Sequence, residues 1–256
     1  MRVDSQQYFT REFLPSLLEP ILKRNRFDAS IVVVPEPGVE GTRWLLDQAA
    51  PHEFIRGVVG WADMREPQVG LLLDEYQLHP KFRGVRWWGV RQASRPVDLH
   101  DVLPPGLTEI ERRGLTLDIA EGFTPAIPEA FPDLRIVADD WREVTPDCAR
   151  FPNLYVKVAG LITGIPGRWK ADDFAPGVRG LLAAFGPERV MYGSDWPAYL
   201  PEGTWKEALA AFTQAIGAQT METREHLLGA TACTFYTVGR TPWSAAGPLA
   251  GPQPSL

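Results

Sequence analysis

The chain has 256 residues, of which 45% are hydrophobic and 23% charged, and its formal net charge is −6. This composition predicts one globular domain, and an acidic chain without a basic cluster argues against a nucleic-acid partner. Cys148 and Cys233 form no CxxC pair, which argues against a disulfide framework or a thiolate zinc site. The first residues lack a secretory apolar core, and no apolar run reaches the roughly 20 residues of a membrane helix. We therefore expect a cytoplasmic protein with no membrane partner.

Short apolar runs alternate with amphipathic runs along almost the whole chain. Continuous hydrophobic runs such as 30–34 favour parallel strands that are covered on both faces. Between them, apolar residues recur at helical spacing, as in the segment Phe13–Leu22. The predicted strands are, in chain order, Arg2–Gln6, Ala29–Pro35, Phe54–Asp63, Phe82–Trp88, Leu115–Glu121, Leu134–Asp140, Leu154–Gly160 and Val190–Asp195.

These eight strand–helix units predict a single-domain α/β protein, a (β/α)8 TIM barrel over residues 1–240. A doubly wound dinucleotide-binding sheet is the alternative, but no glycine-rich GxGxxG turn follows the first strand. Residues 241–256 are rich in Pro, Gly, Ser and Ala, and this composition predicts a flexible tail.

In such a barrel the loops after the strands converge, so the candidate site residues are those that close each predicted strand. Asp118 and Asp139 belong to this set, but we favour other members of it. The favoured polar candidates are Gln6, Tyr8, Arg86, Glu121, Asp140, Lys157 and Asp195, and the aromatic ones are Trp61, Trp87, Trp88 and Trp196. So many ionisable groups at strand ends favour a functional site over plain architecture.

The segment 189–197, RVMYGSDWP, resembles the last-strand signature of the amidohydrolase-related family, which contains sugar lactonases and the pyrone dicarboxylate lactonase. The similarity spans residues 2–238 and implies an amidohydrolase-like barrel. It also implies that Asp195 activates water or moves a proton, although an aspartate that only caps the following turn is the alternative. Four further segments agree in order and spacing, namely Phe54–Trp61, His79–Arg86, Pro152–Leu161 and Thr231–Tyr236.

The chain departs from the family at its metal ligands. The family opens with an Asp-x-His-x-His pattern, and here Gln6 and Tyr8 stand at the two histidine positions. The usual Asp-His pair of the sixth strand is replaced by Asp139 and Asp140. Amide and phenol are poor ligands for transition metals, so we predict no metal and no cofactor. A hard cation held by Asp140 and Asp195 is the alternative.

The four histidines do not restore a metal site. His52 and His79 precede predicted strands, and His226 lies in the last helix, all at the far end or rim of the barrel. His100 lies in the long loop after the fourth strand and could reach the site, but a solvated loop histidine is the simpler interpretation. The first connection is short, with a helix expected from near Glu12, which predicts an open pocket or one completed by a neighbouring subunit.

Lys157 and Arg86 point inward if the predicted registers hold, and each can bind a substrate anion or stabilise an oxyanion. The alternative is that they form ion pairs with Asp139, Asp140 or Glu121 inside the barrel. Arg91, just past the fourth strand, is a further anion-binding candidate.

Gln6 and Tyr8 can donate hydrogen bonds to a bound carbonyl, or they can simply fill the space of the lost metal. The tryptophans predict an aromatic wall for a ring-shaped or apolar ligand, with core packing as the alternative.

Together these features predict a metal-independent hydrolase of a lactone or cyclic ester, a small-molecule substrate. In this prediction Asp195 is the general base, and Lys157 or Arg86 polarises the carbonyl. Two other functions stay open: a non-hydrolytic biosynthetic enzyme (decarboxylase, lyase, isomerase or cyclase) on the same barrel, and a non-catalytic pseudoenzyme. A homo-oligomer is compatible with the sequence.

Overall fold

The computed structural model describes residues 1–89, 103–165 and 169–238. Eight parallel strands form one sheet in the order β1 to β8, so each strand pairs with the next one along the chain. The strands are β1 Val3–Gln7, β2 Ala29–Val33, β3 Ile55–Gly60, β4 Phe82–Trp87, β5 Thr116–Ile119, β6 Arg135–Ala138, β7 Leu154–Val158 and β8 Val190–Tyr192. The predicted tail, Arg91 and His100 lie outside the described residues.

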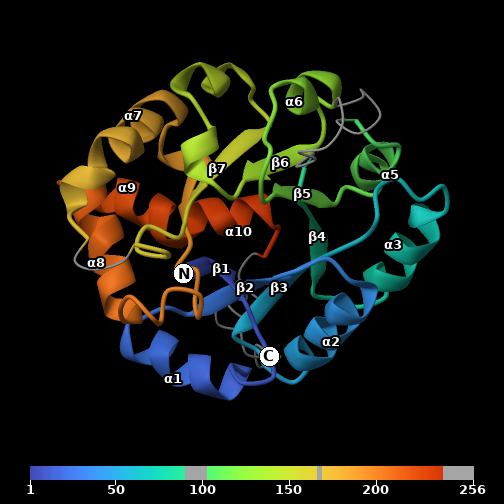
Figure 1. Cartoon of the computed structure of the whole chain (residues 1–256), viewed down its shortest axis with the longest axis horizontal. Helices are drawn as coiled ribbons and strands as arrows, with labels where there is room; N and C mark the ends of the chain where they lie inside the picture. The colour runs from blue at the N-terminus through green and yellow to red at the C-terminus, as the bar shows by residue number, and fades with distance from the viewer. Residues whose placement is uncertain (90–102, 166–168, 239–256) are drawn as a thin grey trace, which may run out of the picture.

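Strands β1 and β8 bring the two edges of the sheet together. The backbone N–H of Tyr8 donates to the carbonyl of Trp196 at 2.8 Å, and that of Asp195 donates to the carbonyl of Gln6 at 3.0 Å. Gly193 permits this close approach, because a Cβ at that position would lie 2.7 Å from the Cβ of Gln6. The strands therefore form a nearly closed barrel ringed by helices, which confirms the predicted TIM barrel (Figure 1).

Helices follow the strands and pack their apolar faces against them. The α-helices are α1 Pro15–Arg24, α2 Val39–Ala49, α3 Val69–Gln77, α5 Gly106–Arg112, α6 Ala126–Ala130, α7 Ala175–Phe185, α8 Trp205–Ile216, α9 Met221–Glu225 and α10 Thr231–Phe235. Short 3-10 helices are η1 Trp141–Glu143, η2 Pro146–Arg150, η3 Ala171–Asp173 and η4 Pro187–Arg189, and η5 His226–Ala230 is a π-helical turn. Within the described ranges, no helix combines the length and apolarity needed to cross a membrane.

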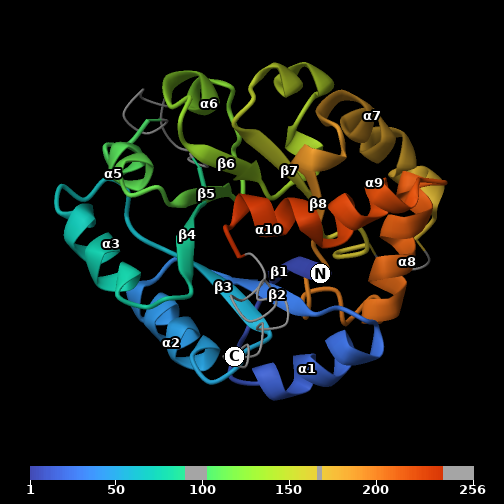
Figure 2. The same ribbon diagram turned by 180° about the vertical axis from the view of Figure 1, so that it is seen from behind.

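Two hydrophobic clusters stabilise the barrel. The outer core, which includes Leu18, Leu73 and Leu117, fills the space between strands and helices. The inner core fills the barrel itself and contains Val3 and Phe235. Phe235 belongs to α10, and Val3 begins β1, so α10 covers the end of the barrel where the strands start. Figure 2 shows α10 crossing the barrel in front of the strands. The polar strand ends therefore face the opposite side.

The start of the first helix differs from the prediction. The helix begins at Pro15 rather than near Glu12, because proline is favoured in the first turn, where its missing N–H costs nothing. The connection before it carries Phe9, which is buried against Trp196 with ring centroids 6.2 Å apart.

Candidate active site

A continuous chain of polar side chains runs through the inside of the barrel, from Tyr236 beside α10 to the C-terminal ends of the strands. We call it the polar belt and define it as Gln6, Tyr8, Arg86, Asp118, Asp139, Lys157, Thr163, Asp195 and Tyr236. Most of these residues lie on a strand or directly after one, as expected for the catalytic end of a TIM barrel.

Lys157 lies at the buried end of the belt between two carboxylates. Its Nζ is 2.6 Å from Asp118 Oδ2 and 2.8 Å from Asp139 Oδ1, and the lysine is completely buried. Tyr236 donates its hydroxyl to Asp118 at 2.6 Å. Burial raises the pKa of Asp118 to about 6, although the nearby ammonium of Lys157 lowers it. Lys157 therefore forms the ion pairs left open by the sequence, and it does not reach the barrel mouth.

Arg86 joins this ion-pair cluster to the rest of the belt. Its Nε lies 3.0 Å from Asp139 Oδ2, and one terminal nitrogen donates to the carbonyl of Val34 at 3.0 Å. The other terminal nitrogen donates to the hydroxyl of Tyr8 at 3.2 Å. The guanidinium also lies over the ring of Trp88, 5.0 Å from its centroid. A cation is thus held in a fixed position beside Tyr8.

Asp195 is held in place by neutral groups. Gln6 Nε2 donates to its Oδ1 at 3.2 Å, and Thr163 donates its hydroxyl to Oδ2 at 2.7 Å. The backbone of Asp195 has a φ of 68°, a left-handed conformation that aspartate tolerates better than most residues. Strained backbone of this kind is typical of functional sites.

The charges of the belt do not balance. Lys157 and Arg86 carry the positive charges, whereas Asp118, Asp139 and Asp195 are carboxylates. The ion pairs of the two cations within the belt involve Asp118 and Asp139. In the part of the chain that the structure describes, no ion pair reaches Asp195. Among the described residues, its carboxylate accepts hydrogen bonds from neutral groups, while the positive charge of Arg86 acts on it from a longer distance.

Gly160 makes room for the carboxylate of Asp195. A Cβ at Gly160 would lie 3.2 Å from Asp195 Oδ2, and the glycine has a φ of 62°, which L side chains rarely adopt. We expect Gly160→Ala to lower the free energy of unfolding by about 1 kcal/mol and to reduce turnover by displacing the carboxylate. Urea unfolding and steady-state kinetics measure the two effects.

A matched control is Gly180→Ala in α7, where the added Cβ would meet nothing within 4 Å. Because alanine favours a helix more than glycine does, this variant should be slightly more stable and equally active. Equal activity of Gly160→Ala and the unaltered protein would contradict the tight fit at Asp195.

Tyr8 lies between Arg86 and Asp195 and is half-buried. Gln6 Nε2 donates to its hydroxyl oxygen at 2.8 Å, in addition to the bond from Arg86. Burial raises the pKa of Tyr8 well above its usual range; the charge of Arg86 lowers it, and Asp195 raises it. The buried Oε1 of Gln6 has no hydrogen-bond partner among the described residues, so it can accept a hydrogen bond from a ligand.

Only part of the predicted aromatic wall faces the belt. Trp196 is 2% exposed and packs against Phe13 with ring centroids 5.6 Å apart, which matches the core packing that the sequence left open as the alternative. Trp61 and Trp87 are half-buried and pack against the outer core. Trp88, whose ring contacts the Arg86 guanidinium, is the tryptophan seen to contact the belt.

Asp140 does not belong to the belt. It caps η1, accepting hydrogen bonds from the backbone N–H of Arg142 at 3.0 Å and from its guanidinium at 3.2 Å. Across the described ranges, no group of three or more His, Cys, Asp or Glu side chains is placed to hold a metal ion. The pairing of Asp140 with Arg142 argues against the alternative of a hard cation between Asp140 and Asp195. Glu121, also predicted, lies half-buried just past β5.

Four belt residues were not favoured by the sequence analysis. From the sequence, Asp118 and Asp139 were placed at strand ends, but other residues there were favoured. Knowledge of the strand registers would have shown that these two side chains point into the barrel. Thr163 lies in the loop after β7, and Tyr236 follows α10. The residue pattern around these two gives no local signal for a position inside the barrel.

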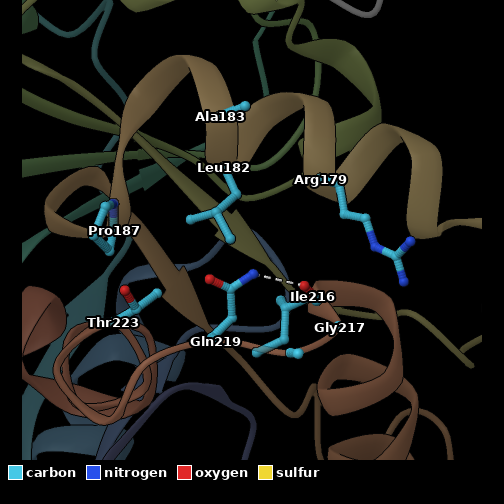
Figure 3. A pocket seen from close by; sticks show the side chains of 9 residues that line it. Arg179, Leu182, Ala183, Pro187, Ile216, Gly217, Gln219 and Thr223 are labelled. Atoms are coloured by element: carbon cyan, nitrogen blue, oxygen red, sulfur yellow. Dashed lines mark hydrogen bonds between the residues drawn. The ribbon is translucent and has the colours of Figure 1, made fainter.

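A shallow pocket on the outside of the barrel lies between α7 and the segment after α8 (Figure 3). Arg179 donates to the carbonyl of Ala215 at 2.8 Å, and Gln219 donates to that of Ile216 at 2.8 Å. These side chains satisfy carbonyls at the end of α8, where no intrahelical donor remains. The pocket therefore has a structural explanation and lies on a different part of the barrel from the belt.

The sequence model of the amidohydrolase family matches residues 10–238. The chain belongs to the amidohydrolase family. It is 30% identical over 254 residues to L-fucono-1,5-lactonase of Burkholderia ambifaria, covering 90% of this chain and 87% of that protein. It is 27% identical over 290 residues to L-fucono-1,5-lactonase of Burkholderia multivorans, covering 93% and 96%. As an amidohydrolase, the protein is an enzyme of the hydrolase type.

A crystal structure of an amidohydrolase from Burkholderia multivorans with bound zinc has the same fold, with a TM-score of 0.84. The two chains are 25% identical, and the match covers 93% of this chain and 99% of that chain.

The belt does not fit such an ion. Gln6 presents its N–H group to both Tyr8 and Asp195, and the Arg86 guanidinium donates to the phenol oxygen. Asp139 lies between two cations. A transition metal requires imidazole, thiolate or carboxylate lone pairs, and the adjacent guanidinium would repel it.

Proposed function

We propose that this amidohydrolase opens a lactone or a related cyclic ester without a metal ion, with Asp195 as general base. The observation that carries the proposal is the environment of Asp195. Asp195 is 8% exposed, and its carboxylate accepts hydrogen bonds from Gln6 and Thr163, which are both neutral. A carboxylate that is held in position and forms no ion pair within the described ranges can take a proton from water. The two related L-fucono-1,5-lactonases support a lactone as the substrate class.

Three groups supply the chemistry in this proposal. Asp195 removes a proton from a water molecule while the water oxygen attacks the carbonyl carbon. The guanidinium of Arg86 provides positive charge for the developing oxyanion. Lys157 acts as a positioning residue, because it holds Asp139, which in turn holds Arg86. A lactone carbonyl is already electrophilic, whereas hydrolysis of an amide or a phosphoester would be harder without a Lewis acid.

Turnover of a lactone panel before and after chelation tests the proposal. The panel includes L-fucono-1,5-lactone, and metal content is measured on the same samples by mass spectrometry. We expect ring opening at a rate that EDTA changes by less than about twofold, because no step depends on a Lewis acid. The zinc-dependent hydrolysis of a known metalloenzyme, treated in parallel, controls for effective chelation.

Two outcomes would contradict this function. Loss of turnover with EDTA and its recovery on addition of Zn²⁺ would show that the reaction needs a metal. Products that have lost CO2 or kept the ring would favour the non-hydrolytic alternatives that the sequence leaves open.

A further inference from the structure

The hydrogen bonds around the hydroxyl group of Tyr8 occupy its lone pairs and leave its proton on the side of Asp195, whose carboxylate raises the pKa of the phenol. Gln6 Nε2 donates to the phenol oxygen at 2.8 Å, and a terminal nitrogen of Arg86 donates to it at 3.2 Å. A phenol oxygen has one proton and two acceptor positions, so both acceptor positions are in use. The O–H is therefore the group that Tyr8 can turn from Asp195 toward a ligand.

Resting on the proposed lactone hydrolysis, we infer that Tyr8 is a catalytic residue that protonates the ring oxygen as the lactone opens. When the tetrahedral intermediate collapses, the bond between the carbonyl carbon and the ring oxygen breaks, and its electron pair stays on that oxygen. The Tyr8 O–H bond breaks as the proton moves to this oxygen, which leaves a phenolate. The proton that Asp195 took from water then moves to the phenolate. The sum is lactone plus water to hydroxy acid, and the enzyme is regenerated.

Two donors beside Tyr8 offset part of the cost of burying the phenolate that this step creates. The guanidinium of Arg86 lies 5.1 Å from the centre of the Tyr8 ring and donates to its oxygen, and the amide of Gln6 supplies a second donor. Hydrogen bonds from a charged donor to an anion are stronger than those between neutral groups. The same two donors therefore hold the phenol in place before transfer and stabilise the anion after it.

Position and protonation state also suit Tyr8 to this role. Tyr8 follows β1 at the barrel mouth and is half-buried, whereas Tyr236 is fully buried with its hydroxyl bonded to Asp118. Because burial keeps the pKa of Tyr8 high, the phenol is protonated at neutral pH. The alkoxide that leaves a lactone is a strong base, which is the acceptor that a phenol of raised pKa needs. Asp195 contacts the same Gln6 amide as Tyr8 and is near enough to return the proton.

Changing the leaving group tests this role of Tyr8. L-fucono-1,5-lactone releases an alkoxide, which needs a proton, whereas dihydrocoumarin releases a phenoxide, which can leave without one. We expect Tyr8→Phe to lower kcat/KM for the first by about 100-fold and for the second by less than about fivefold. Circular dichroism of the variant checks that it is folded.

The control variant is Tyr155→Phe, which removes a phenol from β7 whose ring packs against Phe235 at 4.8 Å. It should leave kcat/KM for both lactones unchanged. Equal losses on both lactones in folded Tyr8→Phe would overturn the acid role while leaving the proposed function intact. Failure of the unaltered protein to open either lactone would overturn the proposed function and this inference with it.

Discussion

Replacing Asp195 by asparagine should lower kcat/KM for lactone opening on the order of 10³-fold. An amide cannot take a proton from water, so the attack loses its general base. The fold should persist, because asparagine also tolerates the left-handed backbone conformation that Asp195 adopts, with a φ of 68°. The carbonyl oxygen of the new amide can still accept the hydrogen bond from Thr163, which is 2.7 Å long in the unaltered protein. Steady-state kinetics and urea unfolding measure activity and stability separately.

Asp140→Asn is the matched control for this prediction. Asp140 also follows a barrel strand, but it caps η1 and pairs with Arg142 at 3.2 Å, and its side chain is 36% exposed. Its replacement should leave kcat/KM unchanged. Wild-type activity in Asp195→Asn would remove the general base from the mechanism and revive the pseudoenzyme or non-hydrolytic alternatives.

The fold was predictable because its signal is local and repeated. A parallel strand that is covered on both faces has a continuous run of apolar residues in its sequence. Such runs identified both the five-residue β2 and the three-residue β8. Apart from β1, which has the predicted length and ends one residue later, the predicted strands were longer than the observed ones, mainly at their C-terminal ends. There the chain leaves the sheet to form loops, but the residues keep a strand-like composition. Asp195 was therefore predicted to end a strand, whereas β8 ends at Tyr192.

The site was only partly predictable, because its membership depends on which way each side chain points. The sequence favoured Asp140 over Asp139, yet neighbouring residues of a strand face opposite sides, and Asp139 is the one inside. The core packing of the Trp196 indole was not predictable for a related reason. The chain turns sharply after Asp195, and the indole packs against the first connection. Tyr236 enters the barrel only because α10 folds across its base, a tertiary event that local patterns do not encode.

The buried ion pairs of Lys157 lead to the second large effect, a loss of stability. Lys157→Met keeps a long flexible side chain but leaves Asp118 without its cation, in a place where both partners are completely inaccessible to solvent. We expect the free energy of unfolding to fall by about 3–5 kcal/mol, since an unpaired buried carboxylate is much costlier than a paired one. Urea unfolding followed by circular dichroism measures the change.

Two further variants separate the charge from the packing of this side chain. In Lys157→Met with Asp118→Asn, the orphaned carboxylate is gone, so part of the lost stability should return even though more of the native contacts are removed. Lys23→Met breaks an ion pair with Glu19 of nearly the same length, 2.7 Å, but with the lysine side chain 73% exposed. Its cost should stay below about 1 kcal/mol, because solvent screens the pair. If Lys157→Met cost no more than Lys23→Met, the charges inside the barrel would be far better solvated than their burial implies. The fixed position of Arg86, on which the oxyanion role depends, would then need another cause.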